Sequence, residues 1–132
     1  MTQLQQLAEP FPPGLIKQPP KGKYGEYVPH SAVTERLLAV VGPYSQEVSE
    51  VLYDADGRVE GVVLTLVFEV DGQTVRISEA GEWSNPQSKT QGARLKDAIS
   101  DATKRCAMRA GLGLHLWSQA DYFLDDMLGG DE

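Results

Sequence analysis

Two Asp-Gly pairs flank the most hydrophobic stretch of this 132-residue chain, and this arrangement restricts the fold more than any other feature of the sequence. The stretch runs from Val59 to Val70 (VEGVVLTLVFEV), between Asp56-Gly57 and Asp71-Gly72. Asp-Gly between runs of alternating apolar residues is a strong signal for a tight hairpin turn. Strand-like runs from Tyr44 to Tyr53 and from Thr74 to Glu79 lie on either side. The pattern therefore predicts a three-stranded antiparallel meander.

The central strand of this meander is apolar on both faces. One face would carry Val62, Leu64, Leu66, Phe68 and Val70, and the other Val59, Val63 and Val67. A strand that is apolar on both sides needs cover on both sides. One helix layer covers one face, and in a chain of this length we expect a second subunit to cover the other.

A helix is predicted between Lys89 and Gly111. Its apolar stripe has the spacing of an amphipathic helix and consists of Leu95, Ile99, Ala102, Cys106 and Ala110. Small residues flank the stripe, which favours close packing of this helix on the sheet. Arg94, Arg105 and Arg109 would lie beside the stripe, with Lys96 and Lys104 on the far side. The glycines at 111 and 113 indicate where the helix ends.

This helix holds a segregated positive charge. Six basic residues against Asp97 and Asp101 give the segment from Lys89 to Gly111 a net charge of +4. The whole chain has a formal charge of −7, so the remainder carries −11. A phosphate responds to charge within about 8–10 Å in physiological salt, so the local excess matters more than the total.

The rest of the chain completes a single α+β domain. Residues 1–23 hold five of the eight prolines and the lysines at 17, 21 and 23, and they are expected to form an extended or flexible basic arm. Residues 24–128 form the domain, with a first helix from about Ser31, as N-cap, to Val41. The expected order is helix, three-stranded meander, long helix on the sheet and short C-terminal helix, followed by an acidic tail at 129–132.

Several classes of function find no support in the sequence. The single cysteine, Cys106, allows no disulfide or cysteine zinc site within one chain, and the two histidines form no metal motif. Catalytic and nucleotide-binding motifs are missing, so we expect no enzymatic activity, no metal and no cofactor. No apolar run is long enough for a membrane span and no signal peptide precedes the domain, so we expect a cytoplasmic protein that does not bind membranes.

Cations on a helix that packs on a sheet suggest a surface that binds nucleic acid. Aromatic side chains that could stack on bases include Tyr24, Tyr27, Tyr44 and Trp83. Alternatively, the cations form an ordinary solvated surface and the aromatic side chains belong to the core.

Taken together, these residues resemble the Rad-fifty-two superfamily of single-strand annealing proteins. The resemblance begins with Tyr27-Val28, Val33, Leu37, Gly42 and Tyr44, continues with the meander, and includes the helix pattern Asp-x-x-Lys-Arg at Asp101, Lys104 and Arg105. The resemblance covers roughly residues 24–125. Small stand-alone versions of this domain are similar to the recombination proteins of bacteriophages.

The resemblance implies a protein that binds single-stranded DNA and anneals complementary strands in recombination and repair, without ATP, as an oligomeric ring. It implies a cytoplasmic location in a bacterial or phage-infected cell, with a single-strand DNA-binding protein or an exonuclease as candidate partners. Lys104 and Arg105 match the family's DNA-contacting pair. Together with neighbouring charges, the expected DNA-binding residues are Lys104, Arg105, Arg109, Arg94, Lys96, Lys89, Arg36 and Tyr44.

The chain departs from the family pattern at two positions. Met108 and Ala32 stand where the family has basic residues, with Arg109 displaced by one position and Arg36 one turn later. The basic arm could compensate for these changes.

Two other interpretations remain open. The element order is also that of a double-stranded RNA-binding module, in which Lys89, Arg94 and Lys96 at the start of the last helix would contact phosphates. An acidic protein-interaction scaffold is the other alternative.

Overall fold

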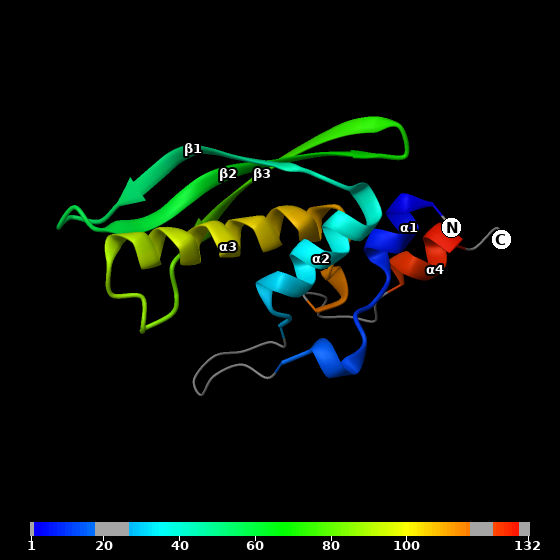
Figure 1. The fold of residues 1–132 in the computed structure, drawn as a ribbon, viewed down its shortest axis with the longest axis horizontal. Helices are drawn as coiled ribbons and strands as arrows, with labels where there is room; N and C mark the ends of the chain where they lie inside the picture. Colours follow the sequence, from blue (N-terminus) through cyan, green and yellow to red (C-terminus); the bar gives the residue numbers. More distant parts are fainter. Residues whose placement is uncertain (1, 18–26, 117–122, 130–132) are drawn as a thin grey trace.

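The computed structural model describes residues 2–17, 27–116 and 123–129. The N-terminal segment contains α1 (Gln3–Ala8) and the 3-10 turn η1 (Pro13–Leu15). The body consists of α2 (His30–Val41), β1 (Ser45–Tyr53), β2 (Val59–Val70), β3 (Gln73–Glu82) and α3 (Gln91–Arg109). The 3-10 turn η2 (Leu114–Leu116) and α4 (Leu124–Gly129) follow. The predicted α+β class is confirmed (Figure 1).

The three strands form the predicted antiparallel meander in the order β1-β2-β3. Val62 of β2 lies between Val51 of β1 and Gly81 of β3. At the second hairpin, Asp71 and Gly72 have φ angles of 50° and 79°, the two positive values that a tight two-residue turn needs. The Asp-Gly signal therefore placed this turn correctly. β3 continues three residues beyond the predicted end at Glu79, because its last residues pair with the start of β2.

α3 packs against the sheet at very short range. A Cβ atom on Gly81 of β3 would overlap the Ala102 backbone nitrogen and the Ala98 carbonyl oxygen. Ala98 and Ala102 are fully buried at this contact. The small residues of α3 thus allow the close approach that the sequence indicated, and Gly81 supplies the matching gap in the strand.

Capping at both ends fixes where α3 begins and ends. The Thr90 side chain accepts a hydrogen bond from the Ala93 amide at 3.1 Å. At the other end the Leu112 amide donates to the Ala107 carbonyl at 3.1 Å, and the Gly111 amide donates to the Met108 carbonyl at 2.9 Å. These two bonds, with Gly111 at a φ of 97°, form a Schellman ending.

The second face of the sheet has no helix over it in the part of the chain that the structure describes. Figure 1 shows the helices on one side of the sheet only. On the open side Val63 and Val67 remain partly exposed, and Arg76 bridges to Glu47 at 2.7 Å across the face. This arrangement leaves room for the second subunit that the apolar pattern predicts, and that subunit stays a prediction.

The N-terminal segment differs from the expected extended or flexible arm. α1 has a complete capping box at Thr2, and Leu7, Ala8 and Phe11 are buried in the domain core. The prolines favoured an extended arm, but the segment before them is apolar enough to form a helix that packs beside α2 and α4. Lys17 pairs with Tyr27 in an isolated antiparallel bridge. The lysines at 21 and 23, Tyr24 and most of the acidic tail fall outside the described residues.

α2 begins slightly earlier than predicted. Its N-cap is Pro29, so Ser31 lies inside the helix and is not the cap. Proline has a fixed φ that suits this boundary, and no side chain of the described residues caps α2. Gly42, with a φ of 76°, ends the helix where the sequence indicated.

Candidate nucleic-acid interface

Lys104 is half-buried on the side of α3 that faces the segment leading into α2. Its ammonium group donates a hydrogen bond to the Val28 carbonyl at 2.7 Å and lies 5.5 Å from the centre of the Tyr27 ring. Tyr27 is 41% exposed, so one side of the phenol ring remains open to solvent. An ammonium group and an exposed aromatic ring are therefore adjacent at this point.

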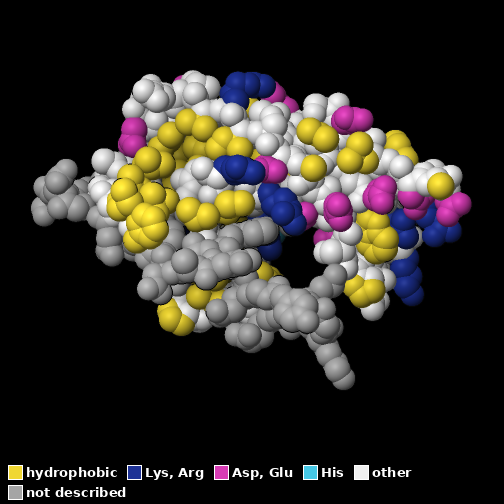
Figure 2. Space-filling model, turned by 180° about the vertical axis from the view of Figure 1, so that it is seen from behind, with side chains coloured by type: hydrophobic (Ala, Val, Ile, Leu, Met, Phe, Trp, Pro, Cys, Tyr) yellow, Lys and Arg dark blue, Asp and Glu magenta, His cyan; other side chains and the backbone are white. Residues whose placement is uncertain are grey.

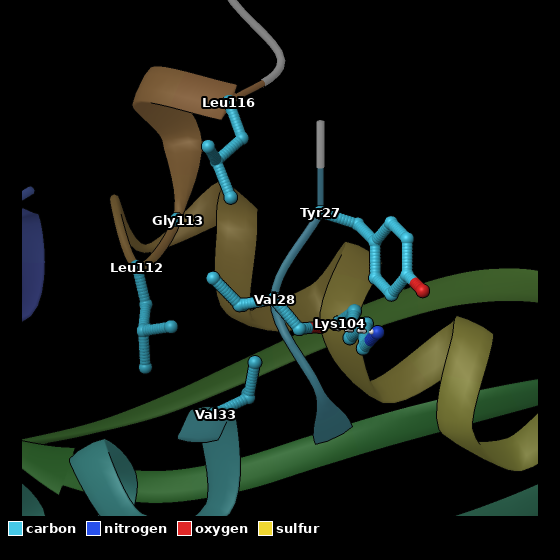
Figure 3. A pocket seen from close by; sticks show the side chains of 7 residues that line it. All are labelled: Tyr27, Val28, Val33, Lys104, Leu112, Gly113 and Leu116. Carbon is cyan, nitrogen blue, oxygen red and sulfur yellow. Dashed lines mark hydrogen bonds between the residues drawn. The ribbon is translucent and has the colours of Figure 1, made fainter. Parts of the chain in front are cut away.

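Lys104 and Tyr27 line a small apolar cavity together with Val28, Val33, Leu112, Gly113 and Leu116 (Figure 3). Its volume is about 60 Å³, well below the roughly 300–1,000 Å³ of pockets that enclose a small-molecule ligand. The cavity is therefore too small to enclose a nucleobase.

Burial changes the acid–base behaviour of this site. Desolvation lowers the pKa of Lys104 from its ordinary value of 10.5, and the carboxylates of Asp101 and Asp97 oppose the change. Burial also lowers the pKa of His30 at the start of α2, and the nearby Lys104 charge adds to the effect. The Nδ1 atom of His30 is buried and finds no hydrogen-bond partner among the described residues. His30 is thus favoured in its neutral form next to the lysine that lines the cavity.

Arg105 and Arg109 point to the other side of α3, toward β3. The Nε atom of Arg105 lies 3.1 Å from Asp101 Oδ2, and the Nε atom of Arg109 lies 2.5 Å from Glu79 Oε2. Asp101 Oδ2 also accepts a hydrogen bond from the Glu82 amide at 3.0 Å. The division of the helix into an arginine side and a lysine side agrees with the predicted helical spacing.

A hollow of about 320 Å³ lies beside these pairs and is lined by Glu79, Ala80, Glu82, Asp101 and Arg105. Three acidic residues and one arginine thus contribute to the lining of this hollow. Lys and Arg side chains on the face shown in Figure 2 likewise lie among Asp and Glu side chains and do not form one continuous basic stripe. The net charge of +4 along α3 therefore overstates how much positive charge this side offers to a phosphate.

The first turns of α3 hold the remaining predicted cations. The guanidinium carbon of Arg94 lies 4.1 Å from the centre of the Trp83 ring, and its Nε atom donates to the Ser88 carbonyl at 3.4 Å. Asp97 accepts hydrogen bonds from the amides of Ser84 and Asn85 and so fixes the loop before the helix. Lys89 and Lys96 are exposed. Arg94 occupies one face of Trp83, which limits stacking of a base on that ring.

Two predicted site residues lie apart from these clusters. Arg36 donates to the carbonyls of Gln6, Leu7 and Glu9 at 3.2, 3.3 and 2.7 Å, and its guanidinium carbon lies 4.4 Å from the Phe11 ring centre. It therefore binds the carbonyl end of α1. Tyr44 is partly buried against the core between α2 and β1. Ala32, which replaces a family basic residue, is buried as well.

Sequence reasoning did not select three residues that shape this interface. The sequence marks Tyr27 as an aromatic that could stack on a base, and its position next to Val28 in the family-like pattern would have justified adding it to the site. Glu79 and Asp101 pair with the arginines; Asp101 could have been found from its i, i+4 spacing to Arg105. Glu79 is thirty residues from Arg109 in sequence, and no local pattern connects the two.

Among the described residues, no group of three or more His, Cys, Asp or Glu side chains is placed to hold a metal ion. In the same residues, no helix has the length and apolar character that crossing a membrane requires. Comparison with models of known protein families gives no match, and a search of curated proteins finds none that is significantly similar.

Proposed function

We propose that this protein binds single-stranded DNA and anneals complementary strands, as an oligomeric ring and without nucleotide hydrolysis, in the manner of the Rad-fifty-two superfamily that its sequence resembles. The observation that carries the proposal is the pairing of Lys104 with Tyr27 at an exposed edge of the domain. The order of a helix, a three-stranded meander and a long helix is compatible with it.

The geometry suggests how a strand would be held. A phosphate would replace the Val28 carbonyl as the partner of the Lys104 ammonium. A base would stack on Tyr27, where stacking contributes roughly 1–3 kcal/mol per base. Because the cavity is too small to enclose a base, the Watson–Crick edges would remain outside. A complementary strand could then test them for pairing.

Annealing of this kind needs no chemical step. Duplex formation is favourable once the repulsion between the two backbones is reduced, and cations on the protein reduce it by displacing counterions. Base pairing between the strands supplies the sequence specificity. The free-energy change of pairing therefore drives the reaction, which fits a protein without a nucleotide-binding motif.

The test is direct. Fluorescence anisotropy with a labelled oligothymidylate should show binding that weakens steeply between about 50 and 200 mM salt. Mixing labelled complementary strands with the protein should accelerate annealing over the spontaneous rate, and light scattering should give a mass above that of a monomer. The double variant Lys104→Ala/Arg105→Ala should bind weakly and still assemble, while Arg58→Gln in the exposed hairpin between β1 and β2 serves as the control for loss of a positive charge.

Competition separates the alternatives. We expect unlabelled single-stranded DNA to displace the probe and duplex RNA to compete poorly. Preferential displacement by duplex RNA would favour a double-stranded RNA-binding module that uses Lys89, Arg94 and Lys96 at the start of α3. If neither nucleic acid binds at about 50 mM salt and the protein stays monomeric, the annealing proposal is wrong and the scaffold interpretation takes its place.

A further inference from the structure

The two arginines on the β3 side of α3 are held by carboxylates in the same way. In each pair the carboxylate contacts the Nε edge of the guanidinium: Asp101 for Arg105 and Glu79 for Arg109. The Arg109 side chain is 62% exposed, whereas the Glu79 side chain is only 21% exposed. The carboxylate thus lies beneath the guanidinium that faces solvent.

This arrangement affects any anion that approaches. A phosphate that binds the outer edge of Arg109 comes close to the Glu79 charge, because the two side chains are in contact. The repulsion of this carboxylate then offsets part of the attraction of the guanidinium. No carboxylate among the described residues forms an ion pair with Lys104; Asp101 and Asp97 act on it only through space, so its attraction for a phosphate is offset less.

The ion pairs contribute little as stabilising elements. Exposed ion pairs of this kind have small effects on folding. α3 is already anchored by its capped ends and by the contact between Ala98, Ala102 and Gly81. On the helix-covered face of β3, Val75 and Ile77 are apolar. Glu79, the next residue on the same face, carries a carboxylate. A function other than stability would account for this charge.

We propose that Glu79 and Asp101 set the affinity of the strand-binding surface by competing with phosphate for Arg109 and Arg105. The inference rests on the proposed function and adds two affinity-setting residues to it. A strand is then held firmly at Lys104 and Tyr27 and loosely on the β3 side of α3. Loose binding on one side lets the strand shift register while it searches for its complement.

The decisive variant is Glu79→Gln, which removes the charge and keeps the shape. We expect its dissociation constant for oligothymidylate to fall about threefold to tenfold relative to wild type at about 100 mM salt, as removal of a like charge a few ångströms from a phosphate implies. The salt dependence should become steeper, by up to about 0.7 in the logarithmic slope, because Arg109 then neutralises one more phosphate. Annealing of long complementary strands should slow, since register shifts are hindered.

Three comparisons make the test specific. Asp56→Asn removes one negative charge from the exposed hairpin between β1 and β2 and should change the dissociation constant by less than about twofold. In an Arg109→Gln background, Glu79→Gln should lose most of its effect. Asp101→Asn should act in the same direction as Glu79→Gln, since an amide oxygen can still accept the hydrogen bond from the Glu82 amide.

The outcomes are distinguishable. If wild type binds the probe but Glu79→Gln binds equally or more weakly, with unchanged thermal unfolding, the inference is overturned and the proposed function stands. The inference is also overturned if Asp56→Asn tightens binding as much as Glu79→Gln, because the effect is then one of net charge. If wild type itself does not bind, the proposed function fails and this inference fails with it.

Discussion

The two sides of α3 both carry cations but present them differently. On one side Lys104 bonds to a backbone carbonyl next to the exposed ring of Tyr27. On the other side Arg105 and Arg109 are paired with Asp101 and Glu79 around a hollow lined mainly by carboxylates. The number of charges on a helix therefore does not describe how each charge is placed; the residues that the fold puts opposite each cation decide whether it is paired with a carboxylate.

The largest effect is expected from disrupting the contact between α3 and Gly81 of β3, which holds the arginine side of the helix against the strand. Gly81→Ala would place a Cβ atom against the backbone of α3 at Ala98 and Ala102, an overlap that cannot be relieved without moving the helix. We expect the free energy of unfolding to fall by about 2–4 kcal/mol, measured by urea denaturation. Gly92→Ala, where an added Cβ meets nothing within 4 Å, is the control and should leave stability unchanged or slightly higher. An unaltered midpoint for Gly81→Ala would contradict the close packing.

The comparison of the two sides is sharpened by removing one cation from each. Lys104→Gln should weaken oligothymidylate binding about tenfold, whereas Arg109→Gln should weaken it only about twofold to threefold, because Glu79 already neutralises much of the Arg109 charge. Anisotropy titrations at one salt concentration measure both. Equal losses, or a larger loss for Arg109→Gln, would show that the β3 side dominates binding.

The exposed ring of Tyr27 next to Lys104 is a second difference between the two sides of α3. Tyr27→Leu should weaken binding about fivefold through loss of stacking, while Tyr27→Phe should bind like wild type because the ring remains. Trp83→Leu, whose ring already has Arg94 over it, should have a smaller effect than Tyr27→Leu. The same titrations provide the measurement. Loss of affinity in Tyr27→Phe would assign the contribution to the hydroxyl group and not to stacking.

The smallest effect concerns pH. Burial lowers the pKa of Lys104 below 10.5, so its ammonium loses the proton at a lower pH than an exposed lysine does. Strand affinity should therefore begin to fall as the pH is raised toward 10.5, and Lys104→Arg should remove that fall. The proteins with and without Lys104→Arg are best compared in a Tyr27→Phe background, which removes the hydroxyl group next to the lysine. A pH profile that is identical with lysine and arginine would show that Lys104 does not contact the strand.

The same pKa shift determines how the free energy of unfolding changes with pH. Between the lowered pKa of Lys104 and 10.5, the unfolded chain binds more protons than the folded protein, so this group makes stability rise with pH in that window. Lys104→Gln should abolish this contribution. Urea denaturation of both proteins across the window tests it.

Much of the fold was predictable from local patterns. The Asp-Gly turns and the alternation around Val59–Val70 indicated the meander, and Gly42 and Gly111 marked the helix ends, because these signals act within a few residues. The buried stripe of α3 was predicted less accurately. Ala98 is fully buried, while Leu95 and Ile99 are only partly buried. The reason is that Gly81, which has no side chain, allows the small-residue side of the helix to approach β3 closely.

The candidate site was predicted only in part. Lys104 could be selected because its motif is local, but Arg36 has a structural partner in α1 that proline-rich composition gave no reason to expect. The pairing of Arg109 with Glu79 joins residues thirty positions apart, and sequence spacing holds no information about such a contact. Arg94 likewise meets Trp83 across a loop whose course depends on Asp97.

By itself, the sequence determined the element types from α2 to α3, the hairpin turns and the apolar faces of the strands, because these depend on residue spacing and on turn-forming residues. It gave no indication of α1, whose helix is stabilised by packing beside α2 and α4. Only the tertiary structure decided which cations of α3 meet carboxylates and which one meets an open aromatic ring. The reason is that electrostatic interactions depend on distance in space: packing brought Glu79 to Arg109 and Tyr27 to Lys104 from distant parts of the chain.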